Sequence, residues 1–146
     1  AVIDRLVRMG IPVMGHLGLT PQAVHRLGYR RQATDAISQE RVVDQARTLE
    51  QKGCFSLVLE HVPAELACRV QQALTIPVIG IGAGDGCDGQ VRVTADLLGL
   101  TAKQPPFSPA LVDGRRLFID ALKGWVQQTR NNTLPTTESP QSAPDC

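Results

Sequence analysis

The chain has 146 residues, of which 42% are apolar, and this is enough for one domain with a hydrophobic core. With 15 Lys and Arg against 14 Asp and Glu, its formal net charge is +1, which argues against nucleic-acid or membrane-surface binding driven by bulk charge. One Trp, one Tyr and three Phe are too few for a base-stacking surface. No apolar run approaches the roughly 20 residues of a membrane-spanning helix.

The start of the chain and its cysteines indicate where the protein works. The sequence begins with Ala1 instead of Met and lacks the pattern of a secretory signal, so we expect a cropped start and a cytoplasmic protein. No C-x-x-C pair occurs, and no His lies near a cysteine at the spacing of zinc ligands. We therefore expect free thiols in a reducing compartment at all four cysteines, which are Cys54, Cys68, Cys87 and Cys146.

Strand and helix patterns alternate along the first half of the chain. A short apolar run at 11–14 predicts a strand, and Thr20 followed by Pro21 predicts the start of a helix, on which His25 would be a surface residue. Ser38 predicts the cap of a longer helix that Gly53 ends.

The same alternation continues into the second half. Nearly continuous apolar runs at 55–59 and 76–81 are typical of parallel strands buried on both faces, and a helix from Pro63 separates them. A run at 91–93 predicts one more short strand.

The C-terminal region predicts one last helix and a tail. Ser108 followed by Pro109 predicts the cap of this helix, and four apolar residues share one of its faces. They are Leu111, Phe118, Leu122 and Trp125. From 131 to 146 the chain is polar, so we predict a folded region at 1–130 and a disordered tail at 131–146.

These elements predict an α/β fold with about four parallel strands and flanking helices. Four such units fit a small open sheet, and they also fit half of an eight-stranded (β/α)8 barrel, which needs about 250 residues. Composition and periodicity alone leave both architectures open.

Glu60 is the residue that points most directly to chemistry. It follows an apolar run, at the carboxyl end of a predicted buried strand, where barrels and doubly wound sheets carry their active sites. An apolar setting raises the pKa of a carboxylate and makes it a better proton acceptor near neutral pH. The alternative is that Glu60 caps the helix starting at Pro63.

His16 is the second candidate, and it lies between two glycines after the first strand. Glycine lets a backbone approach a ligand closely, so a neutral imidazole here could bind a substrate carboxylate or orient Glu60. The alternative is a histidine packed under the loop with its hydrogen bonds satisfied. His61 alternates with Glu60 along the strand and is expected to point away from it.

The glycine-rich loop at 80–89 matches G-x-G-x-x-G from Gly84 to Gly89. A dinucleotide site requires a helix directly afterwards, whereas a strand-like segment follows here, and Asp85 and Asp88 would repel a pyrophosphate. These acids also lack the spacing of a calcium loop. We therefore predict a tight turn with close backbone packing.

Three segments together resemble the ketopantoate hydroxymethyltransferase family. They are GHLGLTPQ at 15–22, LVLEHVPAELA at 57–67, and IPVIGIGAG at 76–84 followed by DGQV at 88–91. The resemblance covers about residues 1–125. It implies the C-terminal half of a (β/α)8 barrel of the TIM type.

The resemblance also implies an activity. The family transfers a hydroxymethyl group from 5,10-methylenetetrahydrofolate to 3-methyl-2-oxobutanoate, giving 2-dehydropantoate in pantothenate synthesis. Mg²⁺ chelates the keto acid, and a glutamate that corresponds to Glu60 removes the C3 proton. The family's histidine motif falls on His16, for which we expect a substrate-binding or orienting role. Homo-oligomers are typical of the family.

The family's metal ligands belong to an N-terminal half that has no counterpart in this sequence. We expect that half as a partner, and we expect the chain alone to be inactive and to aggregate, dimerise or stay partly ordered because its sheet edges are open. The sequence also departs from the family at 86–87, 94–95 and 33–35. The alternative function is a catalytically inactive barrel remnant or protein-interaction module. A free-standing phosphate-binding domain ranks last.

Overall fold

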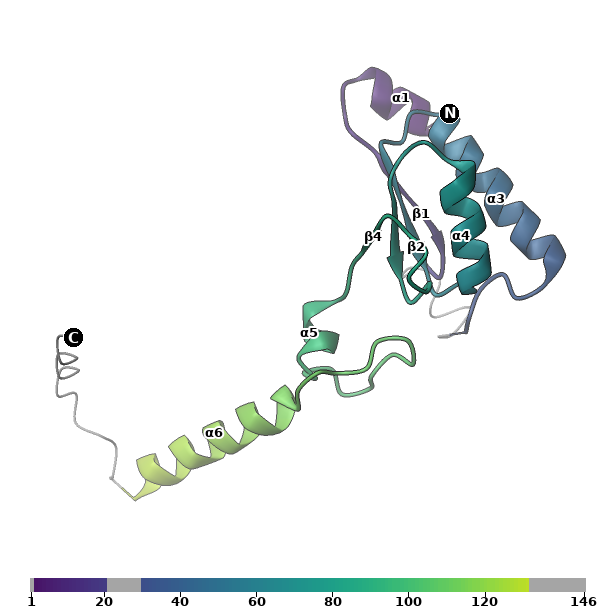
Figure 1. Ribbon diagram of the computed structural model, residues 1–146. Helices are drawn as coiled ribbons and strands as arrows, with labels where there is room; N and C mark the ends of the chain where they lie inside the picture. The colour runs from purple at the N-terminus through teal and green to yellow at the C-terminus, as the bar shows by residue number, and fades with distance from the viewer. Residues whose placement is uncertain (1, 21–29, 132–146) are drawn as a thin grey trace, which may run out of the picture.

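A computed structural model describes residues 2–20 and 30–131 (Figure 1). Four strands form one parallel sheet in the order β1-β2-β3-β4: β1 (Met14–Gly18), β2 (Ser56–Glu60), β3 (Val78–Ile81) and β4 (Gly89–Gln90). The described helices are α1 (Val2–Arg8), α3 (Ala36–Gln51), α4 (Ala64–Ala73), α5 (Thr94–Leu97) and α6 (Gly114–Arg130). The predicted α/β class with four parallel strands and flanking helices is confirmed.

The two faces of the sheet differ in how they are covered. Helices α3 and α4 lie side by side against one face (Figure 1), and they bury Leu57, Leu59 and Val78 completely. On the other face, Met14 is exposed, and Val58 and Ile79 are only partly buried. One face is therefore a hydrophobic core, and on the other the residues 2–20 and 30–131 provide no covering layer.

Helix α3 begins one turn earlier than its expected cap. The N-cap is Asp35, whose side chain accepts a hydrogen bond from the Ser38 backbone N–H at 2.9 Å, and the Ser38 hydroxyl completes a capping box at the N3 position. The prediction that Ser38 is the cap was therefore wrong. Gly53 does end the helix, with a φ of 89° that favours glycine.

The first strand lies later in the chain than predicted, and the last strand lies earlier. The strand predicted at 11–14 begins only at Met14, because Pro12 has no N–H to donate and the Ile11 N–H returns to Leu6 O in the preceding helical turn. The strand predicted at 91–93 was also misplaced. Pairing with β3 is confined to β4 and its flanks, and Val93 already precedes α5 as its N-cap.

The predicted start of the last helix was wrong as well. Ser108 is buried and accepts hydrogen bonds from the Arg92 guanidinium, whereas Asp113 caps α6 by accepting from the Arg116 N–H at 3.2 Å. Leu111 thus precedes the helix. Helix α6 extends away from the sheet (Figure 1), and Phe118, Leu122 and Trp125 are exposed along it.

Several predictions fall outside the described residues. They are the helix from Pro21, the surface position of His25, the tail beyond Asn131 and the state of Cys146. Among the helices that are described, none is both long and apolar enough to cross a membrane.

Candidate active site

Glu60 and His16 meet on the open face of the sheet, near the carboxyl ends of β1 and β2. Glu60 Oε2 lies 3.1 Å from His16 Nε2. The Glu60 side chain is 14% exposed and the His16 side chain 32% exposed. With the carboxylate ionised, the imidazole N–H is the donor. The structure therefore brings together the two site residues that the sequence predicted.

Strand register explains why these two side chains can touch. Glu60 pairs with Gly18 on β1 and with Ile81 on β3. His16 pairs with Val58, which lies two residues before Glu60 on β2. Alternation directs all five residues to the same face of the sheet. Because Gly18 has no side chain, His16 can reach diagonally across to the Glu60 carboxylate.

Gly18 has a backbone role beside this pair. Its φ is 87°, and a Cβ added there would lie 2.1 Å from Glu60 O, which accepts a hydrogen bond from the Leu19 N–H at 2.9 Å. A left-handed φ and this close approach both require glycine. The sequence had indicated a glycine that makes room for a ligand, whereas the described contact is with the backbone of Glu60.

Burial controls the proton affinity of Glu60. Removal from water raises the pKa of its carboxyl above the ordinary value of 4.5, and the nearby charge and hydrogen bond of His16 offset part of this rise. The alternative that Glu60 caps the next helix is not what the structure shows, since α4 has Pro63 at its N-cap and no side-chain capping hydrogen bond.

His61 adjoins the site but makes different contacts. Its φ is 50°, and its ring packs on Phe107 with centroids 4.3 Å apart. Gly82 leaves room for the Phe107 ring, since a Cβ added at Gly82 would lie 2.6 Å from Phe107. Sequence reasoning missed Phe107, which comes from a loop with no pattern to identify it, so only the glycine at 82 offered a signal.

The glycine-rich segment after β3 is a packed turn, as predicted, and β4 follows it instead of a helix. Asp88 holds the segment in place: its carboxylate accepts from Val78 N–H at 2.8 Å and from Gln71 Nε2 at 2.9 Å. These two hydrogen bonds, the backbone one first, lower the pKa of Asp88. Asp88 therefore serves the conformation of this loop.

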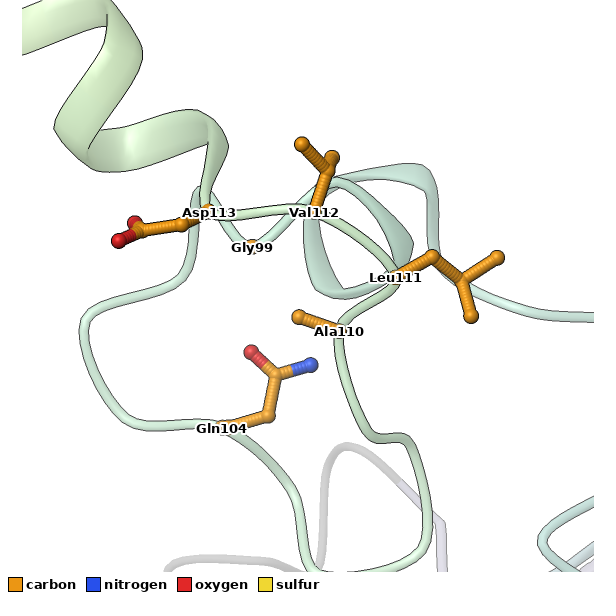
Figure 2. A pocket seen from close by; sticks show the side chains of 6 residues that line it. All are labelled: Gly99, Gln104, Ala110, Leu111, Val112 and Asp113. Atoms are coloured by element: carbon orange, nitrogen blue, oxygen red, sulfur yellow. The ribbon is translucent and has the colours of Figure 1, made fainter.

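A separate pocket lies between α5 and the start of α6. Its volume is about 390 Å³, and its lining consists of Gly99, Gln104, Ala110, Leu111, Val112 and Asp113 (Figure 2). Gln104 donates to the carbonyl oxygens of Asp96 and Ser108, and Asp113 caps α6, so the polar groups of this pocket are already engaged. Its lining contains no contact between a carboxylate and an imidazole like that of Glu60 and His16.

Comparisons with known proteins agree with this architecture. A family model described as ketopantoate hydroxymethyltransferase matches residues 1–137. A 3-methyl-2-oxobutanoate hydroxymethyltransferase of Synechococcus sp. (strain CC9605) is 94% identical over 136 residues, covering 93% of this chain and 50% of the relative.

Two further relatives carry the same name. The protein of Synechococcus sp. (strain CC9902) is 71% identical over 146 residues, covering 100% of this chain and 54% of the relative. That of Prochlorococcus marinus (strain MIT 9303) is 67% identical over 147 residues, again covering 100% of this chain and 54% of the relative. The chain thus spans about half the length of the curated relatives it matches. Since the family model extends over nearly the whole sequence, the chain belongs to the ketopantoate hydroxymethyltransferase family.

Proposed function

We propose that this chain is the C-terminal half of a barrel that transfers a hydroxymethyl group from 5,10-methylenetetrahydrofolate to 3-methyl-2-oxobutanoate, and that it carries the general base. The product is 2-dehydropantoate, in pantothenate synthesis. The observation that carries the proposal is the mostly buried Glu60 carboxylate at the carboxyl end of β2, hydrogen-bonded to His16. Barrel enzymes act at this end of their strands.

Glu60 is the proposed proton acceptor. Its carboxylate takes the proton from C3 of 3-methyl-2-oxobutanoate, and the electrons of the C–H bond pass toward the keto group to form an enolate. The enolate carbon then bonds to the methylene carbon of the folate, and water supplies the hydroxyl oxygen. As these two bonds form, the two bonds from the methylene carbon to the folate nitrogens break. The nitrogens take up two protons, one from C3 by way of Glu60 and one from water, which gives tetrahydrofolate. Burial raises the pKa of Glu60, which strengthens it as a base while leaving it ionised at a pH above that pKa.

His16 is the proposed positioning residue for this base. Its Nε2 binds Glu60 Oε2, so we assign the incoming proton to the other carboxylate oxygen, Oε1. A fixed carboxylate plane keeps Oε1 directed at the substrate and avoids the entropic cost of ordering it during the reaction. A direct contact between the exposed part of the imidazole and the substrate carboxylate is compatible with the same position.

The residues described here do not fit a magnesium site. No group of three or more His, Cys, Asp or Glu that could hold a metal occurs among residues 2–20 and 30–131, and His16 and Glu60 bind each other. We propose that the Mg²⁺ ligands lie in the N-terminal half, and we assign no step of this chain to the metal.

The N-terminal half is the proposed partner of the β1 edge and of the open face. A cavity of about 540 Å³ borders this edge, lined by residues of α1, β1 and α3 and by Val13. It is mainly apolar, and Met14 beside it is exposed. An unpaired edge with apolar surroundings is suited to a further strand and its helix. We also propose a homo-oligomer, which the exposed apolar side chains of α6 support.

The test uses a reconstituted barrel, defined as the half of the Synechococcus CC9605 relative that this chain does not match, joined to residues 1–146. Formation of 2-dehydropantoate is measured with both substrates and Mg²⁺. We expect Glu60→Gln to lower kcat by about 10² to 10⁴, the usual size of a general-base effect. The matched control is Glu65→Gln, an exposed position on α4, which should leave the rate unchanged.

Two outcomes would contradict the proposal. An unchanged rate in Glu60→Gln would remove Glu60 from proton transfer. No turnover in a folded, unsubstituted reconstituted barrel would favour an inactive remnant, which was the alternative function.

A further inference from the structure

The segment between β3 and β4 lies along one face of α4. A Cβ added at Gly84 would lie 2.5 Å from Ala64 Cβ, and one added at Gly86 would lie 2.2 Å from Cys68 Sγ. Farther along the segment, the Asp88 carboxylate accepts from Gln71 Nε2 at 2.9 Å. The three helix positions, 64, 68 and 71, are spaced by four and three residues and so share a face of α4. The segment therefore follows α4 from its first turn to its last.

This packing brings two thiols into the same layer. Cys68 Sγ is directed at Gly86, and the next residue in the chain is Cys87. Cys87 Sγ would lie 3.0 Å from a Cβ added at Gly80, a residue of β3 that pairs with Leu59 on the helix-covered face. Cys87 also packs against the buried core beneath α4. Cys68 thus projects from α4 toward the segment, and Cys87 projects from the next residue of the segment toward β3.

The chemical state of the two cysteines agrees with this proximity. Both are free thiols and both are partly buried. Burial is the main cause that raises the pKa of the Cys87 thiol, followed by the negative charges of Asp88 and of the Cys68 thiolate.

We propose that Cys68 and Cys87 are a redox-sensitive pair that closes reversibly into a disulfide and links α4 to the segment after β3. A disulfide requires Cα atoms about 4.4 to 6.8 Å apart. A Cβ at Gly86 would already lie 3.7 Å from Cys68 Cα, so the two backbones run close together one residue before Cys87. Bond formation needs rotation of the Cys87 side chain from Gly80 toward α4, and the neighbouring glycines give the segment freedom to adjust.

The oxidant class is a low-molecular-weight disulfide, such as oxidised glutathione. The Cys68 thiolate attacks one glutathione sulfur, which forms a mixed disulfide and releases one glutathione thiolate. The Cys87 thiolate then attacks the Cys68 sulfur, forms the Cys68–Cys87 bond and releases the second glutathione. Two protons and two electrons pass from the protein to the oxidant. Cys87 acts second because its side chain packs against the buried core, whereas Cys68 Sγ projects toward the segment at Gly86.

The link would restrain a segment next to the proposed active site. β3 ends at Ile81, and its carbonyl oxygen accepts a hydrogen bond from the His61 N–H at 2.8 Å. His61 directly follows Glu60 in the chain. The glycine-rich segment begins at Gly82. The inference does not depend on the transfer activity, because its test reads a covalent bond.

The experiment uses the reconstituted barrel carrying Cys146→Ser, treated with oxidised glutathione and analysed by intact mass and by peptide mapping under non-reducing conditions. We expect the loss of two hydrogen atoms and a linked peptide pair containing Cys68 and Cys87, both reversed by dithiothreitol. Cys87→Ser should stop the reaction at a glutathione mixed disulfide on Cys68, whereas Cys54→Ser, at a buried position before β2, should keep the link.

A parallel oxidation in guanidinium chloride separates folded proximity from chance pairing. The Cys68–Cys87 link should lose its preference there, because unfolding removes the contact between α4 and the segment. The proposal is overturned if the folded protein with both cysteines stays reduced, stops at a mixed disulfide, or links either cysteine to another partner. These readouts use the unsubstituted pair, so they hold even if a serine variant fails to fold.

Discussion

The two faces of the sheet differ in how far their side chains are buried. On the face under α3 and α4, Leu57 and Leu59 are fully buried in a continuous core. On the other face, Glu60 is mostly buried, His16 is about one-third exposed, and Met14 is exposed. Strand alternation alone separates these two environments, since neighbouring residues on β2 face opposite sides.

The two faces of the same strands therefore carry different residues: the helix-covered face carries the hydrophobic core, and the open face carries the candidate site residues. The covered face packs its core residues against α3 and α4. The open face carries Glu60 and His16 and borders the outer edge of β1, which pairs with no other strand among the described residues. A barrel fills such a face with layers of side chains from all of its strands. Substitutions on the two faces should therefore differ in their cost.

Leu59 and Val58 provide the sharpest contrast, because they are neighbours on β2 and face opposite sides. Leu59→Ala removes a fully buried side chain and should destabilise the reconstituted barrel by about 2 to 5 kcal/mol. Val58→Ala should cost much less in the isolated chain, where Val58 is only partly buried. Urea unfolding of each variant measures both effects.

The same pair also tests the missing layer. If the N-terminal half covers the open face, the cost of Val58→Ala should increase from the isolated chain to the reconstituted barrel, while the cost of Leu59→Ala should stay similar. Equal costs for Val58→Ala in both proteins would argue against a covered inner face.

Gly18→Ala tests the backbone junction between the two strands. The added Cβ would lie 2.1 Å from Glu60 O, and the φ of 87° disfavours any residue with a side chain. We expect a loss of about 1 to 3 kcal/mol in the free energy of unfolding, typical of a strained backbone position. Gly10→Ala is the control, since its φ is also positive but nothing lies within 4 Å of an added Cβ.

A loss of stability as large in Gly10→Ala as in Gly18→Ala would show that φ alone sets the cost. A larger loss in Gly18→Ala, together with reduced turnover, would show that the contact with Glu60 matters for the placement of the base.

The sequence predicted the layers of the fold better than the ends of its elements. Apolar runs located β2 and β3 because buried parallel strands need apolar side chains on both faces. Caps were harder to predict: Ser38 and Ser108 both have the chemistry of an N-cap, yet Asp35 and Asp113 occupy those positions. Side-chain type identifies a helix start only to within one or two turns, since several polar residues nearby can accept from the free N–H groups.

The residues of the candidate site were predictable, and orientation of Glu60 by His16 was one of the two roles expected for the imidazole. Position after a strand singled out Glu60 and His16, and the structure adds that they bind each other across Gly18. That contact depends on strand register, which a single sequence does not specify. The Phe107 contact with His61 depends on a long loop returning to the strand ends, and no local pattern announces it.

Glu60→Gln should lower the rate but raise the stability of the barrel near neutral pH relative to the parent. Burial raises the pKa of Glu60 in the folded state above its ordinary value of 4.5. The protonated group therefore contributes to the free energy of unfolding below pH 4.5, and this contribution is lost as the pH rises through the folded-state pKa. The stability of Glu60→Gln relative to the parent barrel should therefore increase from pH 4 to pH 7. Thermal unfolding at the two pH values measures this, and a pH-independent difference would contradict burial of the carboxylate.

The smallest expected effect is a shift in the pH profile on removing His16. In the proposed mechanism Glu60 must be ionised to accept a proton, so kcat/KM should rise with pH through the pKa of that group. His16 lowers this pKa through its charge and hydrogen bond, and His16→Leu removes both, leaving burial unopposed. The acidic limb should therefore move to higher pH, and His16→Gln, whose amide can still donate to Oε2, should bring it part of the way back. If the limb stays fixed in His16→Leu while kcat/KM falls at every pH, the imidazole acts on the substrate and does not position the base.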